Sequence, residues 1–302
     1  MLSKAVLDNL FHGARQAAFD LLPGLWFMCK RVDADVPYSS QALALDVFGT
    51  LKYAKSRDRV CNLMASLLEV PPGGPWEVLL EFEDPDNLLH EMQHKSQIDV
   101  LLKGAKSLIA LECKFAETRL EPCSQIGKTG KGVVQCNGNY ELQVNPANGR
   151  TSFCALSGKG IRYWEHIPRI FQFPADQAHR PCPFARDWYQ WMRTLVMADA
   201  LAEKRGLRPA AGLVYVDRPT MPLYNRIRTA SDEMTARLTG AAKCELLRFE
   251  KLPGMFETAA ENSEEEALFR SLRHWVTAKV NWVEARLSNA RAARQPPRSK
   301  RC

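Results

Sequence analysis

The sequence predicts a mixed α/β fold in which helices flank a mixed β-sheet. Two observations lead there: apolar runs of strand length, and separate segments whose apolar residues recur every three or four positions, as on one face of a helix. The chain has 302 residues, of which 46% are hydrophobic and 25% charged, so it can bury a large core. We expect one domain over residues 1–285, with a core at about 36–160 and further α/β elements at about 185–285.

Two helices are expected before the first strand. The first 20 residues place five apolar side chains on one side of a helix: Leu7, Leu10, Ala14, Ala17 and Ala18. The second helix should begin near the Ser39-Ser40 pair, because serine is a favoured N-cap residue. Its buried face follows an i, i+3 pattern through Ala42, Leu45, Phe48 and Leu51.

Three strands follow a break at Pro71-Pro72-Gly73-Gly74-Pro75. The first covers residues 76–82 and ends at the polar turn 84–87. The next two, at 96–102 and 107–115, are separated by four residues that include Gly104, a connection typical of a hairpin. This hairpin carries the residues on which the functional prediction depends.

The second half alternates between helical and strand-like segments. Its closing helix should start at a capping box, Ser263-Glu264-Glu265-Glu266. On the predicted helix 185–204, Trp188, Tyr189 and Trp191 could stack on bases, but their periodic placement favours core packing. The expected elements are a loop at 121–150, a strand at 151–156, a helix at 185–204, strands at 210–216 and 244–249, a helix at 224–238 and the closing helix to 287.

The formal charge of +7 is concentrated at the C-terminal end. Residues 286–302 hold six basic residues and no acid, and without them the remainder carries +1: Arg286, Arg291, Arg294, Arg298, Lys300 and Arg301. We expect a flexible basic tail over 286–302. Such a tail suits a polyanion, although basic tails are also common solubilising ends.

The composition argues against a membrane or a secreted protein. No apolar run reaches the 18 or so residues needed to cross a bilayer, and the run at 21–28 is broken by Pro23 and Gly24. No secretory signal is recognisable, so we expect a cytoplasmic protein that does not enter membranes. In that setting the nine cysteines are expected to be reduced thiols or metal ligands.

Two acids and a lysine on the hairpin form the strongest chemical pattern. In Glu112-Cys113-Lys114 the two-residue period of a strand puts Glu112 and Lys114 on one face and Cys113 on the other. Asp99 lies between Ile98 and Val100 on the preceding strand, so it can converge on Glu112. An edge strand with an i, i+2 salt bridge is the structural alternative.

Two close carboxylates in a largely apolar sheet repel each other unless a cation lies between them. Mg²⁺ prefers oxygen ligands and retains several waters, so Asp99 and Glu112 could hold it together with a phosphate oxygen. The metal would polarise the phosphate and activate water, while the Lys114 ammonium would orient that water or offset charge. The pattern therefore predicts hydrolysis of phosphodiesters.

The sequence resembles the PD-(D/E)XK nuclease superfamily, whose motif is an Asp followed by (D/E)XK on the next strand. Asp99 and Glu112-Cys113-Lys114 match it, with Ile98 where the named proline stands. The segments Ser39-Ser40-Gln41-Ala42-Leu43-Ala44 and Tyr163-Trp164-Glu165 also resemble those of bacterial restriction endonuclease-like members.

This resemblance implies a restriction-endonuclease-like core and a nuclease that cleaves DNA with Mg²⁺ or Mn²⁺ in restriction, defence or repair. The superfamily often adds an acid, a Gln and a Tyr nearby, and Glu83, Gln135 and Tyr140 are the candidates. The oligomeric state stays open, including a homodimer. The non-enzyme alternative is a catalytically silent nucleic-acid-binding module of the same fold.

A zinc metalloprotease is the rival enzyme class. His90-Glu91-Met92-Gln93-His94 fits H-E-x-x-H, in which two histidines one helical turn apart bind zinc. That motif needs a sturdy helix, whereas here a turn precedes it and a strand follows by Ser96, so a polar connector is the favoured interpretation.

Cys123, Cys136, Cys154 and Cys182 follow the triad and are candidate ligands of an Fe–S cluster or zinc, as some nucleases of this superfamily carry. Their spacings match no short metal motif, and buried small hydrophobic side chains are the alternative.

Gly127-Lys128-Thr129-Gly130-Lys131-Gly132 lacks the first glycine of a phosphate-binding loop, because Pro122 stands there. ATP binding is therefore not supported. Lys128 and Lys131 could still lie near a nucleic-acid backbone, although a solvated loop is the commoner meaning of such a sequence.

Overall fold

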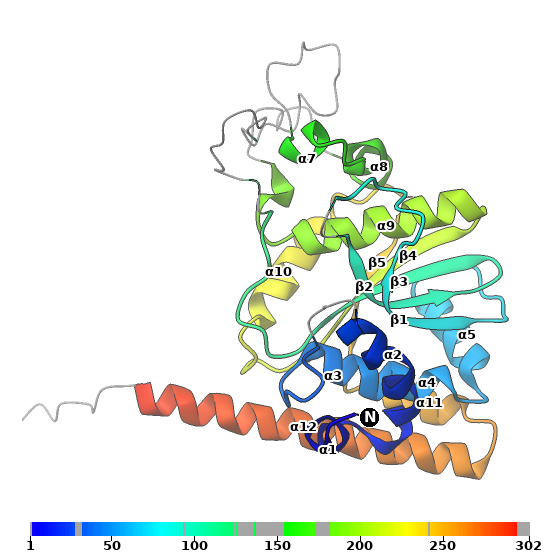
Figure 1. Ribbon diagram of the computed structural model, residues 1–302, viewed down its shortest axis with the longest axis vertical. Coiled ribbons are helices and arrows are strands. Elements are labelled where there is room, and N and C mark those ends of the chain that lie inside the picture. The colour runs from blue at the N-terminus through cyan, green and yellow to red at the C-terminus, as the bar shows by residue number, and fades with distance from the viewer. Residues whose placement is uncertain are drawn as a thin grey trace, which may run out of the picture.

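A five-stranded mixed sheet forms the centre of the molecule, with helices on both faces (Figure 1). The computed structural model describes residues 2–27, 32–92, 95–123, 125, 136, 154–172, 182–240 and 242–294. The strands follow one another in chain order across the sheet: β1 (Glu77–Glu83), β2 (Gln97–Lys103), β3 (Ser107–Lys114), β4 (Arg208–Tyr215) and β5 (Cys244–Arg248). The predicted class, a restriction-endonuclease-like mixed sheet flanked by helices, is confirmed, as are these five strands.

The first three strands form an antiparallel meander, and β4 and β5 continue the sheet in parallel with β3. The β2–β3 hairpin pairs Lys103 with Leu108 and Val100 with Leu111. Its turn needs a glycine, because a Cβ atom on Gly104 would lie 2.7 Å from the carbonyl oxygen of Gly73. The predicted hairpin thus forms.

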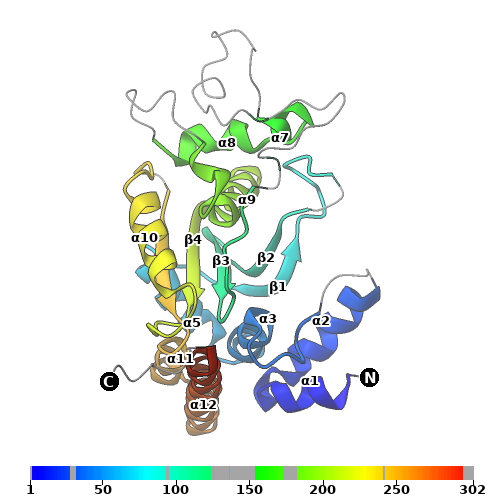
Figure 2. The same cartoon turned by 90° about the vertical axis from the view of Figure 1, so that its left-hand side faces the viewer.

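One face of the sheet is covered by the N-terminal helices and by the last two helices of the chain (Figure 2). Val78, Val100, Leu111 and Cys113 project into this layer. Its helices are α1 (Lys4–Asn9), a 3-10 turn (His12–Ala14), α2 (Arg15–Phe27), α3 (Ser40–Ala44), a π-helical turn (Leu45–Gly49), α4 (Thr50–Lys52), α5 (Arg57–Leu67), α11 (Leu252–Ala259) and α12 (Ser263–Arg294).

The helix expected after Ser39 forms as predicted, since the Ser39 hydroxyl accepts a hydrogen bond from Ala42 N and caps α3. The π-helical turn that follows presents Asp46, which is fully buried. Asp46 accepts hydrogen bonds from Phe11 N (2.6 Å), Trp275 Nε1 (2.9 Å) and Lys279 Nζ (2.7 Å). Asp46 thus links the π-helical turn to α12 through Trp275 and Lys279, and to the N-terminal segment through Phe11.

The opposite face is covered by α7 (Ala155–Gly158), α8 (Tyr163–Ile170), a 3-10 turn (Pro183–Ala185), α9 (Tyr189–Arg205) and α10 (Tyr224–Thr235) (Figure 1). Trp188 and Trp191 are buried in this layer, which favours the core-packing interpretation over base stacking. The strand predicted at 151–156 is wrong at its described end. Ala155 begins a short helix, and Gly158 N donates to Cys154 O (2.9 Å).

The closing helix α12 forms, but its cap lies one residue earlier than predicted. Asn262 Oδ1 accepts from Glu265 N (2.9 Å), while the Glu265 carboxylate turns back to accept from Glu261 N (2.9 Å). The tail expected over 286–302 is helical as far as Arg294, and residues 295–302 lie outside the described part. Within the described residues, no helix combines the length and low polarity that spanning a bilayer requires.

Candidate functional site

An acidic cavity of about 660 Å³ opens where β1 and β3 end and β2 begins. The strands contribute Glu81, Asp99, Glu112 and Lys114 to its lining. The remaining walls come from the segment before α3, which includes Ser39 and Gln41, and from three residues of α9: Gln190, Arg193 and Thr194. The structure therefore brings Asp99, Glu112 and Lys114 into one cavity.

Glu112 and Lys114 share a face of β3 because side chains alternate along a strand. Both side chains are buried, and Lys114 Nζ donates to Glu112 Oε1 at 2.7 Å. Cys113, between them, is fully buried in the core on the other face. The acid and the ammonium group thus meet at the end of the central strand.

Asp99 approaches from β2, one residue past the point where the β2–β3 ladder ends at Val100 and Leu111. Since the backbone pairing stops there, the Asp99 carboxylate takes the place of a strand partner and accepts from Cys113 N at 2.6 Å. Burial raises the pKa of Asp99 well above its ordinary value, and the charges of Glu112 and Glu81 raise it further. A carboxylate here is costly without a cation.

Lys114 supplies part of that positive charge. Burial by itself lowers the pKa of Lys114, but Glu112 and then Asp99 favour its charged form, and the net effect raises the pKa above its ordinary value. Lys114 therefore stays an ammonium group at neutral pH. It neutralises only one of the acids around it.

Of the two acids on β1, Glu81 lines the cavity and the predicted candidate Glu83 does not. Glu83 lies at the end of β1, opposite Gln97, and its Oε1 is 3.7 Å from Lys95 Nζ; it does not line the cavity. Glu81 falls opposite Asp99 in the β1–β2 register, between the pairs Leu80–Val100 and Phe82–Ile98. Alignment of the two predicted strands would have identified it.

Glu81 also has an unusual backbone. Its φ is 49°, in the left-handed region that a non-glycine residue in a strand rarely adopts. Such strain is found most often beside active sites, where a local distortion re-aims a side chain.

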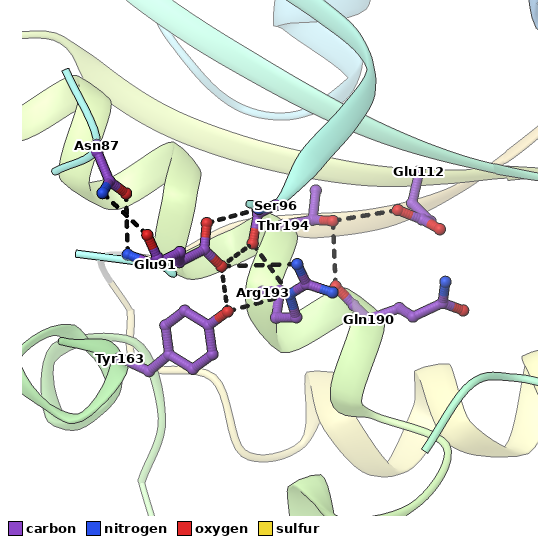
Figure 3. Close-up of polar contacts among 8 residues, drawn as sticks. All are labelled: Asn87, Glu91, Ser96, Glu112, Tyr163, Gln190, Arg193 and Thr194. Atoms are coloured by element: carbon purple, nitrogen blue, oxygen red, sulfur yellow. Dashed lines mark hydrogen bonds and ion pairs between the residues drawn. The ribbon is translucent and has the colours of Figure 1, made fainter. Parts of the chain in front are cut away.

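The first turns of α9, which were not among the predicted site residues, form the opposite wall. Thr194 Oγ1 lies 3.3 Å from Glu112 Oε2 and 3.1 Å from the carbonyl oxygen of Gln190, and its hydroxyl proton is shared between them (Figure 3). The other Glu112 oxygen accepts from Lys114. The available signal was the spacing of Gln190, Arg193 and Thr194, whose i, i+3, i+4 pattern puts three polar groups on one stripe of an otherwise apolar helix.

Arg193 links this wall to the loop before β2. Its Nε donates to Ser96 Oγ (2.9 Å) and Tyr163 Oη (3.1 Å), and its Nη2 lies 3.5 Å from Glu91 (Figure 3). Glu91 is buried and also accepts hydrogen bonds from Ser96 and Tyr163. This network fixes α9 relative to the strand that carries Asp99.

The same network contradicts the zinc-protease hypothesis. No helix covers His90 to Met92, and His90 has a left-handed φ of 52°; His94 lies outside the described residues. The loop is held instead by Asn87, whose side chain exchanges two 2.9 Å hydrogen bonds with the backbone of Glu91. Glu91 faces Arg193 and Tyr163, so it is not available to activate a zinc-bound water.

A divalent ion matches the donors of the acidic cavity. Its lining has six acids (Asp33, Glu81, Asp99, Glu112, Glu117 and Glu121) and three cations (Lys95, Lys114 and Arg193), a formal charge of −3. Oxygen donors in this number suit Mg²⁺ or Mn²⁺. Asp99 and Glu112 both contribute carboxylate oxygens to this lining.

His166, Asp199 and Glu203 form a second group whose ligand atoms lie within 4.8 Å of one another. The Arg169 guanidinium lies among them, 2.6 Å from Asp199 Oδ2 and 2.8 Å from both His166 Nδ1 and Glu203 Oε2. Because arginine already supplies the positive charge, this group is better explained as an ion-pair network than as a metal site.

The remaining predicted site residues fall into two groups: residues outside the described part of the chain, and the four cysteines. Gln135, Tyr140, Lys128 and Lys131 lie outside the described residues. The four candidate cysteines (Cys123, Cys136, Cys154 and Cys182) are free thiols of intermediate exposure. They lie outside the lining of the acidic cavity.

Comparison with known proteins identifies the family. No curated protein and no solved structure matches the chain. One family model, described as "Restriction Endonuclease associating with ARP", matches residues 6–216, which is more than half of the chain and includes every residue that lines the acidic cavity. The chain therefore belongs to this restriction endonuclease family.

Proposed function

We propose that this protein is a metal-dependent endonuclease that hydrolyses DNA phosphodiester bonds in the acidic cavity. The observation that carries the proposal is the convergence of Asp99, Glu112 and Lys114 at the ends of two neighbouring strands. Membership of a restriction endonuclease family supports the reaction class and DNA as the substrate.

Asp99 and Glu112 would hold Mg²⁺ or Mn²⁺ through their carboxylate oxygens, with Glu81 close behind Asp99. When bound, the ion would polarise a phosphate and lower the pKa of a coordinated water. The hydrogen bonds from Cys113 N to Asp99 and from Thr194 to Glu112 orient the two acids in advance. Both acids are therefore preorganised by main-chain and helix contacts.

Lys114 provides a fixed positive charge beside the reacting phosphate. Its 2.7 Å bond to Glu112 uses one of its three N–H donors, so the others are free to orient the attacking water or to offset charge that develops on the phosphate. Mutational losses at such positions are commonly about 10²–10³-fold in rate.

The charge of the cavity favours an enzyme over a silent binding module. A formal charge of −3 repels a phosphate backbone unless a divalent cation binds first, whereas binding modules present basic surfaces. The cavity is thus suited to binding DNA together with a metal ion.

Incubation of supercoiled plasmid with the protein and Mg²⁺ or Mn²⁺, with a chelator as control, tests the proposal. We expect metal-dependent nicking by the wild-type protein and by Glu83→Ala, and none by Asp99→Ala or Lys114→Ala. DNA that is retarded in a gel but stays intact would support the binding module. Nicking that survives both substitutions would overturn the assignment, and single-stranded or duplex RNA in parallel reactions would establish the substrate class.

A further inference from the structure

Four of the nine cysteines come together beside the start of α9: Cys123, Cys136, Cys154 and Cys182. The thiolate charges of Cys123, Cys136 and Cys154 would each raise the pKa of Cys182. The thiolate charges of Cys136 and Cys154 would also raise the pKa of Cys123. All four cysteines therefore lie close enough to interact electrostatically. Four segments that are far apart in the sequence thus place their cysteines near one another.

Backbone contacts independently place the segments of Cys123 and Cys182 side by side. Cys123 N donates to Ala185 O (3.2 Å), and Ala185 N donates to Cys182 O (3.0 Å), so the chain after β3 lies against the turn that carries Cys182. Cys123, Cys154 and Cys182 all pack against the hydrophobic layer that contains α8 and α9. The other described cysteines, Cys61, Cys113 and Cys244, are buried in the core and have no such neighbours among their interactions.

The sulfur atoms have the surroundings of metal ligands. The Cys123 sulfur accepts a hydrogen bond from the backbone N–H of Gln125, and the Cys182 sulfur accepts one from that of Phe184, each two residues further on. Such bonds stabilise thiolates and are a usual feature of cysteine-ligated clusters.

The spacing of the sulfurs favours a centre larger than one zinc ion. With Zn–S bonds of about 2.3 Å, tetrahedral geometry sets sulfur atoms about 3.8 Å apart. Among the described residues, no three of these sulfurs lie within 4.8 Å of one another. A cubane iron–sulfur cluster is held by four cysteine thiolates around a wider core.

We propose that Cys123, Cys136, Cys154 and Cys182 hold a four-iron iron–sulfur cluster. It fastens the segment after β3, the start of α7 and the turn before α9 into one unit. That unit adjoins Tyr189 and Arg193, both of which interact electrostatically with Cys123. Since Arg193 and the neighbouring Thr194 line the acidic cavity, the cluster would hold the α9 wall in place.

The test is metal and sulfide analysis of full-length protein purified without oxygen. We expect about four iron and four acid-labile sulfide per chain, with broad absorbance in the visible range that bleaches on reduction. Cys136→Ser and Cys182→Ser should each lose most of the iron, whereas the matched control Cys244→Ala should retain it. Circular dichroism checks that each variant is folded.

A second measurement covers variants that fail to fold. In native wild-type protein, the four cysteines should resist alkylation until iron is removed by a chelator, as mapped by mass spectrometry, and Cys244 should not change with the iron. The cluster proposal would be overturned if the protein stayed free of iron after reconstitution, or if both serine variants retained their iron. It would also be overturned if the protein contained one zinc ion and no iron. Because nicking is measured separately, an iron-containing protein that leaves DNA intact would contradict only the proposed nuclease.

Discussion

The backbone N–H of Cys113 donates a 2.6 Å hydrogen bond to Oδ2 of Asp99, which ties the acid of β2 to the residue between Glu112 and Lys114. Main-chain geometry therefore determines where the Asp99 carboxylate points. The same contact holds two acids close together in a buried setting, at a cost in folding free energy when no cation is bound.

Asp99→Asn should separate this cost from the hydrogen bond, because an amide oxygen can still accept from Cys113 N. We expect the metal-free variant to unfold at a higher temperature than metal-free wild type at pH 8. Mg²⁺ at about one hundred times its Kd should stabilise the wild type by about 2.7 kcal/mol and the variant by much less. Equal stabilisation of both proteins by Mg²⁺, measured by differential scanning calorimetry, would show that Asp99 is not a ligand.

The pH dependence has a definite sign. The pKa of Asp99 is raised by burial and by Glu112, so the folded protein binds this proton more tightly than the unfolded chain, in which the ordinary value is 3.8. Its contribution to the stability of the metal-free protein is present below about pH 4 and is lost as pH rises through the raised pKa. Urea unfolding of wild type and Asp99→Asn over this range should show the difference between them growing with pH; a constant difference would contradict the assignment.

Thr194 positions Glu112 from α9, and its substitution should weaken metal binding without breaking the fold. Thr194→Val keeps the shape of a buried side chain but removes the 3.3 Å hydrogen bond to Glu112 Oε2. We expect about a tenfold loss of cleavage and a higher Mg²⁺ concentration for half-maximal rate. Thr194→Ser keeps the hydroxyl and should restore both values. A valine variant with an unchanged Mg²⁺ requirement would leave Thr194 with a packing role only.

Glu81 and Glu83 form a matched pair two residues apart on one strand. Glu81 lines the cavity and raises the pKa of Asp99, whereas Glu83 lies near Lys95 outside the cavity. Glu81→Gln should reduce nicking at low Mg²⁺ by about tenfold, in the range seen for groups around metal ligands, and Glu83→Gln should leave the rate unchanged. Rate profiles against Mg²⁺ concentration measure both effects, and the reverse ranking would favour Glu83 as the additional acid.

The strands and the Glu112/Lys114 pair could be predicted because each depends on local periodicity. Apolar runs of strand length located β1 to β5, and the period of two put Glu112 and Lys114 on one face. The walls of the cavity could not be predicted in this way. Glu81 becomes part of the site through the β1–β2 register, and Thr194 through the packing of a helix about eighty residues further along the chain. Both depend on tertiary contacts that one segment of sequence does not encode.

Glu91 should prove structural, and His90 dispensable. Glu91 is the buried partner of Arg193, Tyr163 and Ser96, so Glu91→Ala leaves the guanidinium of Arg193 without its anion and should cost about 3–5 kcal/mol of unfolding free energy. His90 is exposed with φ of 52°, and asparagine tolerates that conformation, so His90→Asn should change stability by less than about 0.5 kcal/mol. Chemical denaturation measures both free energies. A zinc protease would behave in the opposite way, with the histidine variant losing bound zinc and casein hydrolysis while Glu91→Ala stays stable.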